Sequence, residues 1–297
     1  MAFVAELGAI ELSVGERFPP ARHGREMIGS LRAEFMKLGR RPALWVLTVL
    51  AVAAIVLLVY GLLYLGTHNP TPGDQPARVA DAKLRLYPAD FLWEVLGNLS
   101  SFHNALALIL GALAFGSEYG WGTWKTVFTQ APSRLEAVTA KFVAVALTVV
   151  VWTITTLVAA ALCSYVAATA DESALHWPGW REIARAAGSV FLVLLMWATM
   201  GAVLAVALRQ AAVALGLGII YAAIELILAG TIRQQGGVVR ALPGFNATAL
   251  ADSFAPSHLL SPPSVAVGPG QAAVVLALYV CAFVLAAALL VGYRDVT

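Results

Sequence analysis

The residue types that usually carry enzyme chemistry are sparse and scattered in this chain. It has five histidines, and none has a metal-ligating partner at helical spacing: His23, His68, His103, His176 and His258. The glycine-rich stretch 116–122 lacks the lysine of a phosphate-binding P-loop and follows no predicted strand. A Gly-x-Ser-x-Gly nucleophile motif is also missing. We therefore predict no catalytic residues, no metal site and no cofactor bound by this chain.

Polar residues inside apolar runs are the stronger candidates for function, because such groups are costly in a membrane. A lone carboxylate, Glu225, lies in one run and is predicted to serve substrate passage or outer gating, or to be a structural hydrogen-bonding group beside Tyr221. The first half of another run carries polar residues that are predicted to line a pathway: Asn98, Ser101, His103 and Asn104. The alternative is a solvated segment that precedes a later-starting span.

Residues 117–141 contain a short segment with exposed apolar character. Trp124 and Phe128 follow a break allowed by Gly122, and a Ser-x-x-Glu capping box at Ser133 then starts a helix. Such a segment is a candidate docking surface for a soluble partner. The alternative is an interfacial helix that touches only lipid head groups.

The elements that must position these residues are membrane spans. The 297 residues are 60% hydrophobic and only 12% charged, and several runs approach the ~20 residues needed to cross a bilayer. We predict an all-α integral membrane protein with a six-span transmembrane domain over residues 43–292. Its spans are predicted at 43–65, 96–115, 142–168, 187–208, 211–232 and 271–291, with a tight turn at Arg209-Gln210.

The remaining segments are predicted to lie outside the membrane or at its surface. Residues 1–26 are interpreted as a cytoplasmic tail without a cleavable signal, and 27–41 as an amphipathic helix at the membrane interface. The loop 233–270 is predicted to lie outside the cytoplasm and to contain one short helix at about 247–260.

Charge sets the expected orientation. Lysine and arginine total 12 on the side of the termini and 7 on the other, so both termini are predicted to be cytoplasmic. A net charge of +2 is too small to indicate a nucleic-acid partner. The excess of arginine over lysine is typical of a GC-rich genome, and we expect a bacterial protein of the cytoplasmic membrane.

Several motifs follow one another in a fixed order. Glu118-Tyr119-x-x-Gly122-Thr123 follows predicted span two, and Pro132-Ser133-Arg134 and Lys141 come after it. The lead-in before span one is Arg32-x-Glu34-x-x-Lys37-x-x-Arg40-Arg41, and Leu242-Pro243 lies in the last outer loop. In these motifs and in the six-span layout, the chain resembles the permease subunits of ABC-2 type transporters over about residues 31–294.

The resemblance implies a subunit that couples to separate ATPases. Two nucleotide-binding subunits, which would hold ATP and Mg, would dock from the cytoplasm, and a second permease copy or a paralogue would complete a dimer. Residues 27–41 would be the interface helix, with Arg32, Glu34, Lys37 and Arg40. Loop 117–141 would contain a short coupling helix, and the residues expected to couple to the ATPase are Glu118, Tyr119, Gly122, Thr123, Trp124, Phe128, Pro132 and Arg134.

The expected function is export of a small molecule, peptide or lipid by alternating access, with ATP hydrolysis in the separate subunits. Two alternatives remain. One is an ion- or proton-coupled transporter without an ATPase, for which Glu225 is the available relay group. The other is a non-transporting membrane anchor or sensor.

Overall fold

The computed structural model describes residues 39–120, 122, 134–232, 240–259 and 267–293, together with Gly29 and Met36. Within these ranges the regular structure is helical and no strand occurs. The main helices of the described residues are α3 Pro42–Ala53, η1 Ala54–Gly61, α4 Leu62–His68, α5 Pro76–Leu84, α6 Phe91–Asn98, η2 Leu99–His103, α7 Asn104–Gly120, α9 Arg134–Ala170, α10 Trp180–Leu208, α11 Ala211–Ile232, α12 Pro243–Asp252 and α13 Pro269–Tyr293.

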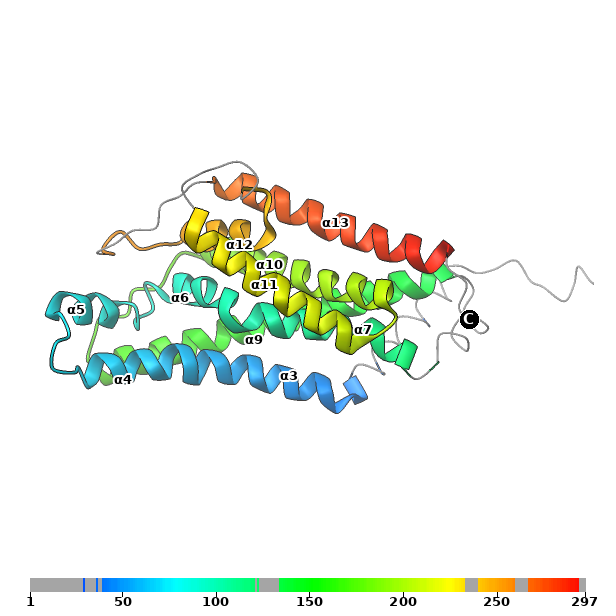
Figure 1. Cartoon of the computed structure of the whole chain (residues 1–297). Helices are drawn as coiled ribbons and strands as arrows, with labels where there is room; N and C mark the ends of the chain where they lie inside the picture. The colour runs from blue at the N-terminus through cyan, green and yellow to red at the C-terminus, as the bar shows by residue number, and fades with distance from the viewer. Residues whose placement is uncertain are drawn as a thin grey trace, which may run out of the picture.

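Helix α10 runs through the middle of a bundle of long helices (Figure 1). It packs most extensively against α7 and then against α13, and it also contacts α11 and α9. The start of α3 and the end of α13 lie at the same end of the bundle, which we call the Arg41 end (Figure 1). The opposite end carries α5 and is called the α5 end.

Two glycines allow α7 and α10 to approach closely. A Cβ atom on Gly111 would lie 1.8 Å from the carbonyl oxygen of Ala198, and one on Gly201 would lie 2.1 Å from the carbonyl oxygen of Leu108. Small residues at helix crossings are typical of membrane bundles, where association depends on close packing and not on hiding apolar groups from water. The central contact of the fold therefore requires glycine at both positions.

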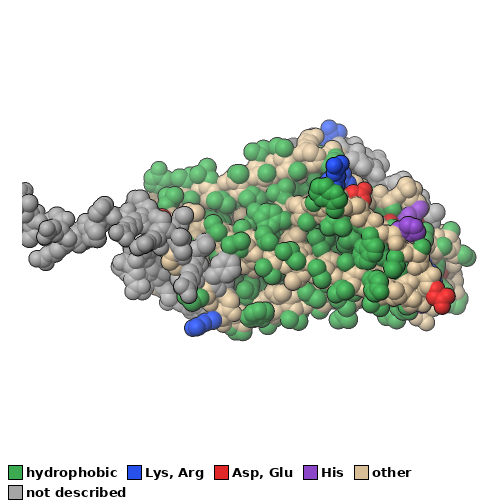
Figure 2. Space-filling view, turned by 180° about the vertical axis from the view of Figure 1, so that it is seen from behind, with side chains coloured by type: hydrophobic (Ala, Val, Ile, Leu, Met, Phe, Trp, Pro, Cys, Tyr) green, Lys and Arg blue, Asp and Glu red, His purple; other side chains and the backbone are tan. Residues whose placement is uncertain are grey.

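The surface between the two ends is mostly apolar, as Figure 2 shows, and charged side chains gather toward the α5 end. Among the described residues, four helices are long and apolar enough to cross a membrane: Pro42–His68, Leu135–Ala170, Trp180–Leu208 and Pro269–Tyr293. They correspond to predicted spans one, three, four and six. Helices α6–η2–α7 and α11 occupy predicted spans two and five, and the six-span count stays a prediction.

Two π-helical segments, η1 and η2, interrupt the first two predicted spans, and a hydrogen bond links η2 to the end of α3 just before η1. The Nε2 atom of His103, at the end of η2, lies 3.0 Å from the carbonyl oxygen of Ala51, just before η1. A carbonyl can only accept, so Nε2 carries the proton in this contact. Trp152 of α9 adds a second link to span one by donating to the Thr48 hydroxyl at 2.8 Å.

Several boundaries differ from the sequence prediction. The short helix of loop 233–270 occupies Pro243–Asp252 instead of 247–260, because Pro243 favours the first turn of a helix and Pro256 cannot continue one. Helix α5 was missed because its composition is polar. The polar start of predicted span two is helical from Phe91, and both interpretations of it, a pathway-lining part of the span and a solvated segment before a later-starting span, stay predictions. The predicted turn at Arg209 is confirmed, with φ of 55°.

We predict that Gly201→Ala destabilises the bundle, because its new methyl group must displace the backbone of α7. Overpacking of this kind costs about 1–3 kcal/mol. Thermal unfolding of the detergent-solubilised protein is the measurement. The matched control is Gly188→Ala on the same helix, where a Cβ meets nothing within 4 Å. Equal unfolding temperatures for the two variants would contradict the close contact.

Candidate functional site

A buried ionic cluster lies at the Arg41 end, where three helices meet. The Nζ atom of Lys141 on α9 lies 2.8 Å from Oε1 of Glu118 on α7, and each of these two side chains is only 2% exposed. A guanidinium nitrogen of Arg41, directly before α3, lies 3.7 Å from the same oxygen. Burying a charge is costly unless it is paired and hydrogen-bonded, so these three residues constrain one another's positions.

Further hydrogen bonds hold the cluster on the last turns of α7. Arg41 donates to the Ser117 hydroxyl at 2.9 Å and to the Leu113 carbonyl at 3.5 Å. Lys141 donates to the Ala114 carbonyl at 3.4 Å. The cluster therefore connects the start of α3, the end of α7 and the beginning of α9. Arg41 was not among the predicted site residues, although its basic pair with Arg40 before Pro42 was visible in the sequence.

Glu118, which is expected to couple to the ATPase from loop 117–141, is buried at the end of α7. It is the single carboxylate of α7 and faces the helix interface, and Tyr119 beside it is half-buried. Gly122 has a φ of 65°, which is the left-handed conformation that glycine adopts without strain. Arg134 begins α9. The predicted coupling residues Thr123, Trp124, Phe128 and Pro132 lie outside the described residues, as does the predicted coupling helix.

The predicted interface helix 27–41 is described only in part. Gly29, Met36 and Arg40 are helical, and the Arg40 side chain is exposed. Arg32, Glu34 and Lys37 lie outside the described residues. The interface role of this segment stays a prediction.

Two of the polar residues of span two line a cavity of about 230 Å³ between α6, η2, α7, α10 and α12. Asn98 and Asn104 contribute to its wall. His103 is instead buried against span one through its contact with Ala51, and it does not line this cavity. Ser101 lies in η2, but its side chain is outside the described part of the chain. Sequence reasoning found the polar helix but could not assign its faces.

Glu225 lies against the first turn of α12. The backbone N–H of Phe245 donates to its Oε1 at 3.0 Å, and a Cβ on Gly244 would lie 2.8 Å from its carboxyl carbon. The first N–H groups of a helix lack partners within the helix and favour a negative charge. Tyr221, one turn earlier, also hydrogen-bonds the carboxylate. The geometry supports the structural interpretation of Glu225, in which it anchors α12 to α11.

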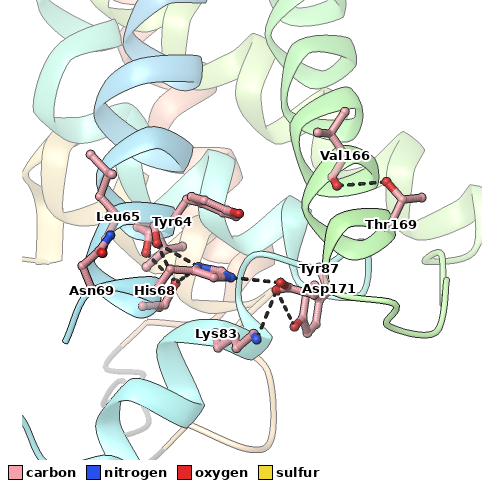
Figure 3. A network of polar contacts seen from close by, with 11 residues as sticks. Tyr64, Leu65, His68, Asn69, Lys83, Tyr87, Val166, Thr169 and Asp171 are labelled. Carbon is pink, nitrogen blue, oxygen red and sulfur yellow. Dashed lines mark hydrogen bonds and ion pairs between the residues drawn. The ribbon is translucent and has the colours of Figure 1, made fainter.

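A second polar network joins three segments at the α5 end (Figure 3). Asp171 follows α9, and its carboxylate lies 2.9 Å from Nε2 of His68, 3.4 Å from Nζ of Lys83 and 3.0 Å from the Tyr87 hydroxyl. Burial alone would raise the pKa of the Asp171 carboxyl, but the hydrogen bonds from His68, Tyr87 and Lys83 hold this pKa below its ordinary value. The network fixes α5 and the following segment to the ends of spans one and three.

The part of the chain that the structure describes contains no group of three or more His, Cys, Asp or Glu residues placed to hold a metal ion. Its polar clusters are ion pairs and hydrogen-bonded networks that join helices. What the arrangement can do is transmit a displacement from one helix to another.

We predict that Lys141→Met destabilises the protein by about 3–5 kcal/mol, because it leaves the Glu118 carboxylate buried without its nearest cation. Removing both charges in Glu118→Leu/Lys141→Leu should restore most of this loss. The measurement is unfolding in detergent. Lys83→Met is the matched control, because that ion pair is 40% exposed on the lysine side and should contribute at most about 1 kcal/mol. A double variant no better than Lys141→Met would contradict the pairing.

The Asp171 network predicts acid sensitivity. Because the pKa of Asp171 is lowered on folding, its stabilising contribution is complete above the ordinary aspartate pKa of about 3.9 and is lost as the pH falls through the lower folded value. Asp171→Asn should therefore flatten the loss of thermal stability between about pH 5 and pH 3. The neighbouring exposed carboxylate gives the control Glu172→Gln, which should leave the profile as in the parent. An unchanged profile for Asp171→Asn would refute the assignment.

Comparison with known proteins bears on this geometry. A family model described as ABC-2 family transporter protein matches residues 30–225, which include the ionic cluster, the loop between α7 and α9, and Glu225. No curated protein matches the chain. The match covers about two thirds of the sequence and agrees with the resemblance carried by Glu118, Gly122 and Lys141. The chain therefore belongs to the ABC-2 family of transporter proteins and is a multi-pass membrane protein.

Proposed function

We propose that the chain is the membrane subunit of an ATP-driven exporter that works with separate ATPase subunits. The observation that carries this proposal is the buried cluster of Arg41, Glu118 and Lys141. Glu118 and Lys141 stand at the two ends of loop 117–141, and Arg41 ends the predicted interface helix. A partner that pushes on this loop acts directly on both of its anchoring helices.

The packing indicates how such a push would spread. Through Arg41 the cluster reaches α3, and through Glu118 it reaches α7, which packs closely against the central helix α10. Packed helices transmit displacement because their interiors are dense and resist compression. Closure of the ATPases is thereby converted into a rearrangement of the spans, as alternating access requires.

The proposed assembly contains two permease chains, as a homodimer or with a paralogue, and two cytoplasmic ATPase subunits that bind ATP and Mg. Six spans are proposed, with α6–η2–α7 as span two and α11 as span five. The Arg41 end faces the cytoplasm, in agreement with the excess of lysine and arginine on that side. The transported molecule is a small molecule, a peptide or a lipid, and the site of action is the cytoplasmic membrane.

The alternatives of ion- or proton-coupled transport and of a membrane anchor or sensor have less support. Coupling to a proton would require a relay group in the membrane, and Glu225 is engaged with the backbone of α12. A purely anchoring role leaves the polar cavity between α6, α10 and α12 without a use.

Affinity purification of the tagged protein in mild detergent tests the proposal, with mass spectrometry of the proteins that come with it. We predict a stoichiometric P-loop ATPase, and we expect Trp124→Asp and Phe128→Asp to abolish its capture because a charge disrupts an apolar contact. The matched control Trp180→Asp changes a 74% exposed tryptophan at the α5 end and should leave capture intact. Preparations that lack any ATPase across several detergents would overturn the proposal.

A further inference from the structure

The cavity beside Asn104 has a wall that is unusual for the inside of a helical bundle. Its polar lining comes from Arg85, Trp93, Asn98, Asn104, Thr248 and Asp252, and leucine, valine and alanine side chains complete it. A space with this many polar groups is unsuited to a lipid tail. It is suited to a molecule that forms several hydrogen bonds.

The wall offers several hydrogen-bond acceptors to a ligand. Asn104 is only 4% exposed, and its Oδ1 has no hydrogen-bond partner among the described residues. The amide nitrogen of Asn98 is already engaged by Glu94, because it donates to the backbone oxygen of Glu94 at 2.8 Å and to its Oε2 at 3.2 Å. Thr248 donates its hydroxyl proton to the Gly244 carbonyl at 3.0 Å. All three side chains therefore offer oxygen lone pairs to a ligand, and the amide nitrogen of Asn104 can donate in addition.

Both charged side chains at the cavity interact with other groups of the protein. Arg85 pairs with the Glu94 carboxylate and places its guanidinium 4.7 Å from the ring centre of Trp93. Asp252 is likewise in contact with another group of the chain. Because these side chains already interact within the protein, they would not neutralise a charged ligand, and burying such a ligand would be costly.

We propose that this cavity binds a small, neutral, hydroxyl-rich molecule. Its hydroxyl groups donate to Asn104, Asn98 and Thr248, and its carbon skeleton lies against the apolar part of the wall. By volume the cavity would hold about eight water molecules, which suits a ligand of roughly monosaccharide size. That this ligand is the transported molecule rests on the proposed export function, whereas the binding itself does not.

Binding can be measured without any ATPase, so it separates this proposal from the export function. The full-length protein is purified in a detergent whose head group contains no sugar or glycol. Equilibrium dialysis then measures binding of labelled glucose, myo-inositol and glycerol as neutral probes. Ethanolamine and inorganic phosphate serve as cationic and anionic probes of similar size.

We expect saturable binding of at least one neutral probe and weaker or no binding of the charged probes. Asn104→Leu and Thr248→Val should each weaken the binding affinity for the neutral probe at least about tenfold, because each removes an acceptor from the wall. Thr199→Val is the matched control, because it removes a buried hydroxyl of α10 that does not line the cavity. It should leave binding unchanged.

Three outcomes would overturn the proposal. They are no saturable binding of any neutral probe, stronger binding of a charged probe, or binding of a neutral probe that is unchanged in both Asn104→Leu and Thr248→Val. If Asn104→Leu fails to fold, Thr248→Val carries the test, since threonine and valine have nearly the same shape. ATPase capture that persists while polyol binding is absent would leave the export function standing and remove this ligand assignment alone.

Discussion

Helices in a lipid environment gain little by hiding apolar side chains from one another, and this constraint shapes the whole bundle. Cohesion must come from close backbone contact and from polar groups that find partners inside the protein. The close backbone contact is the approach of α7 to α10 at Gly111 and Gly201. The polar partners at the Arg41 end are Glu118 and Lys141. Within the spans, His103 contacts the Ala51 carbonyl and Trp152 donates to Thr48.

The polar groups of the described chain are concentrated where helices must be held in register. At one end Arg41, Glu118 and Lys141 join three helices, and at the other Asp171 joins His68, Lys83 and Tyr87. Between the two ends lies a polar cavity bounded by α12, and α12 is itself held to α11 by Glu225. The described part of the chain therefore has defined polar contacts at both ends of the bundle and a polar cavity between them.

Hydropathy was sufficient to locate the four longest apolar helices, because a span must be long and apolar whatever its neighbours are. It could not indicate α5, whose sequence is polar, or the π segments, which have no known pattern in composition. The role of Glu118 also escaped prediction. A carboxylate next to a loop usually lies in water, and its burial became evident only when Lys141, 23 residues later, was found beside it. Asn98 and His103 show the same limit, because neighbouring polar residues of one helix face different partners.

The π segments η1 and η2 have a consequence for how this chain can change over evolution. A π-helix has more residues per turn than an α-helix, so it shifts the angular phase of every side chain that follows it. Losing a single residue within η2 would rotate the rest of α7 by roughly 100° relative to α6. Gly111 would then no longer face α10, and Glu118 would at the same time no longer lie beside Lys141. The irregular winding of η2 thus keeps the two halves of one span in phase with two different neighbours.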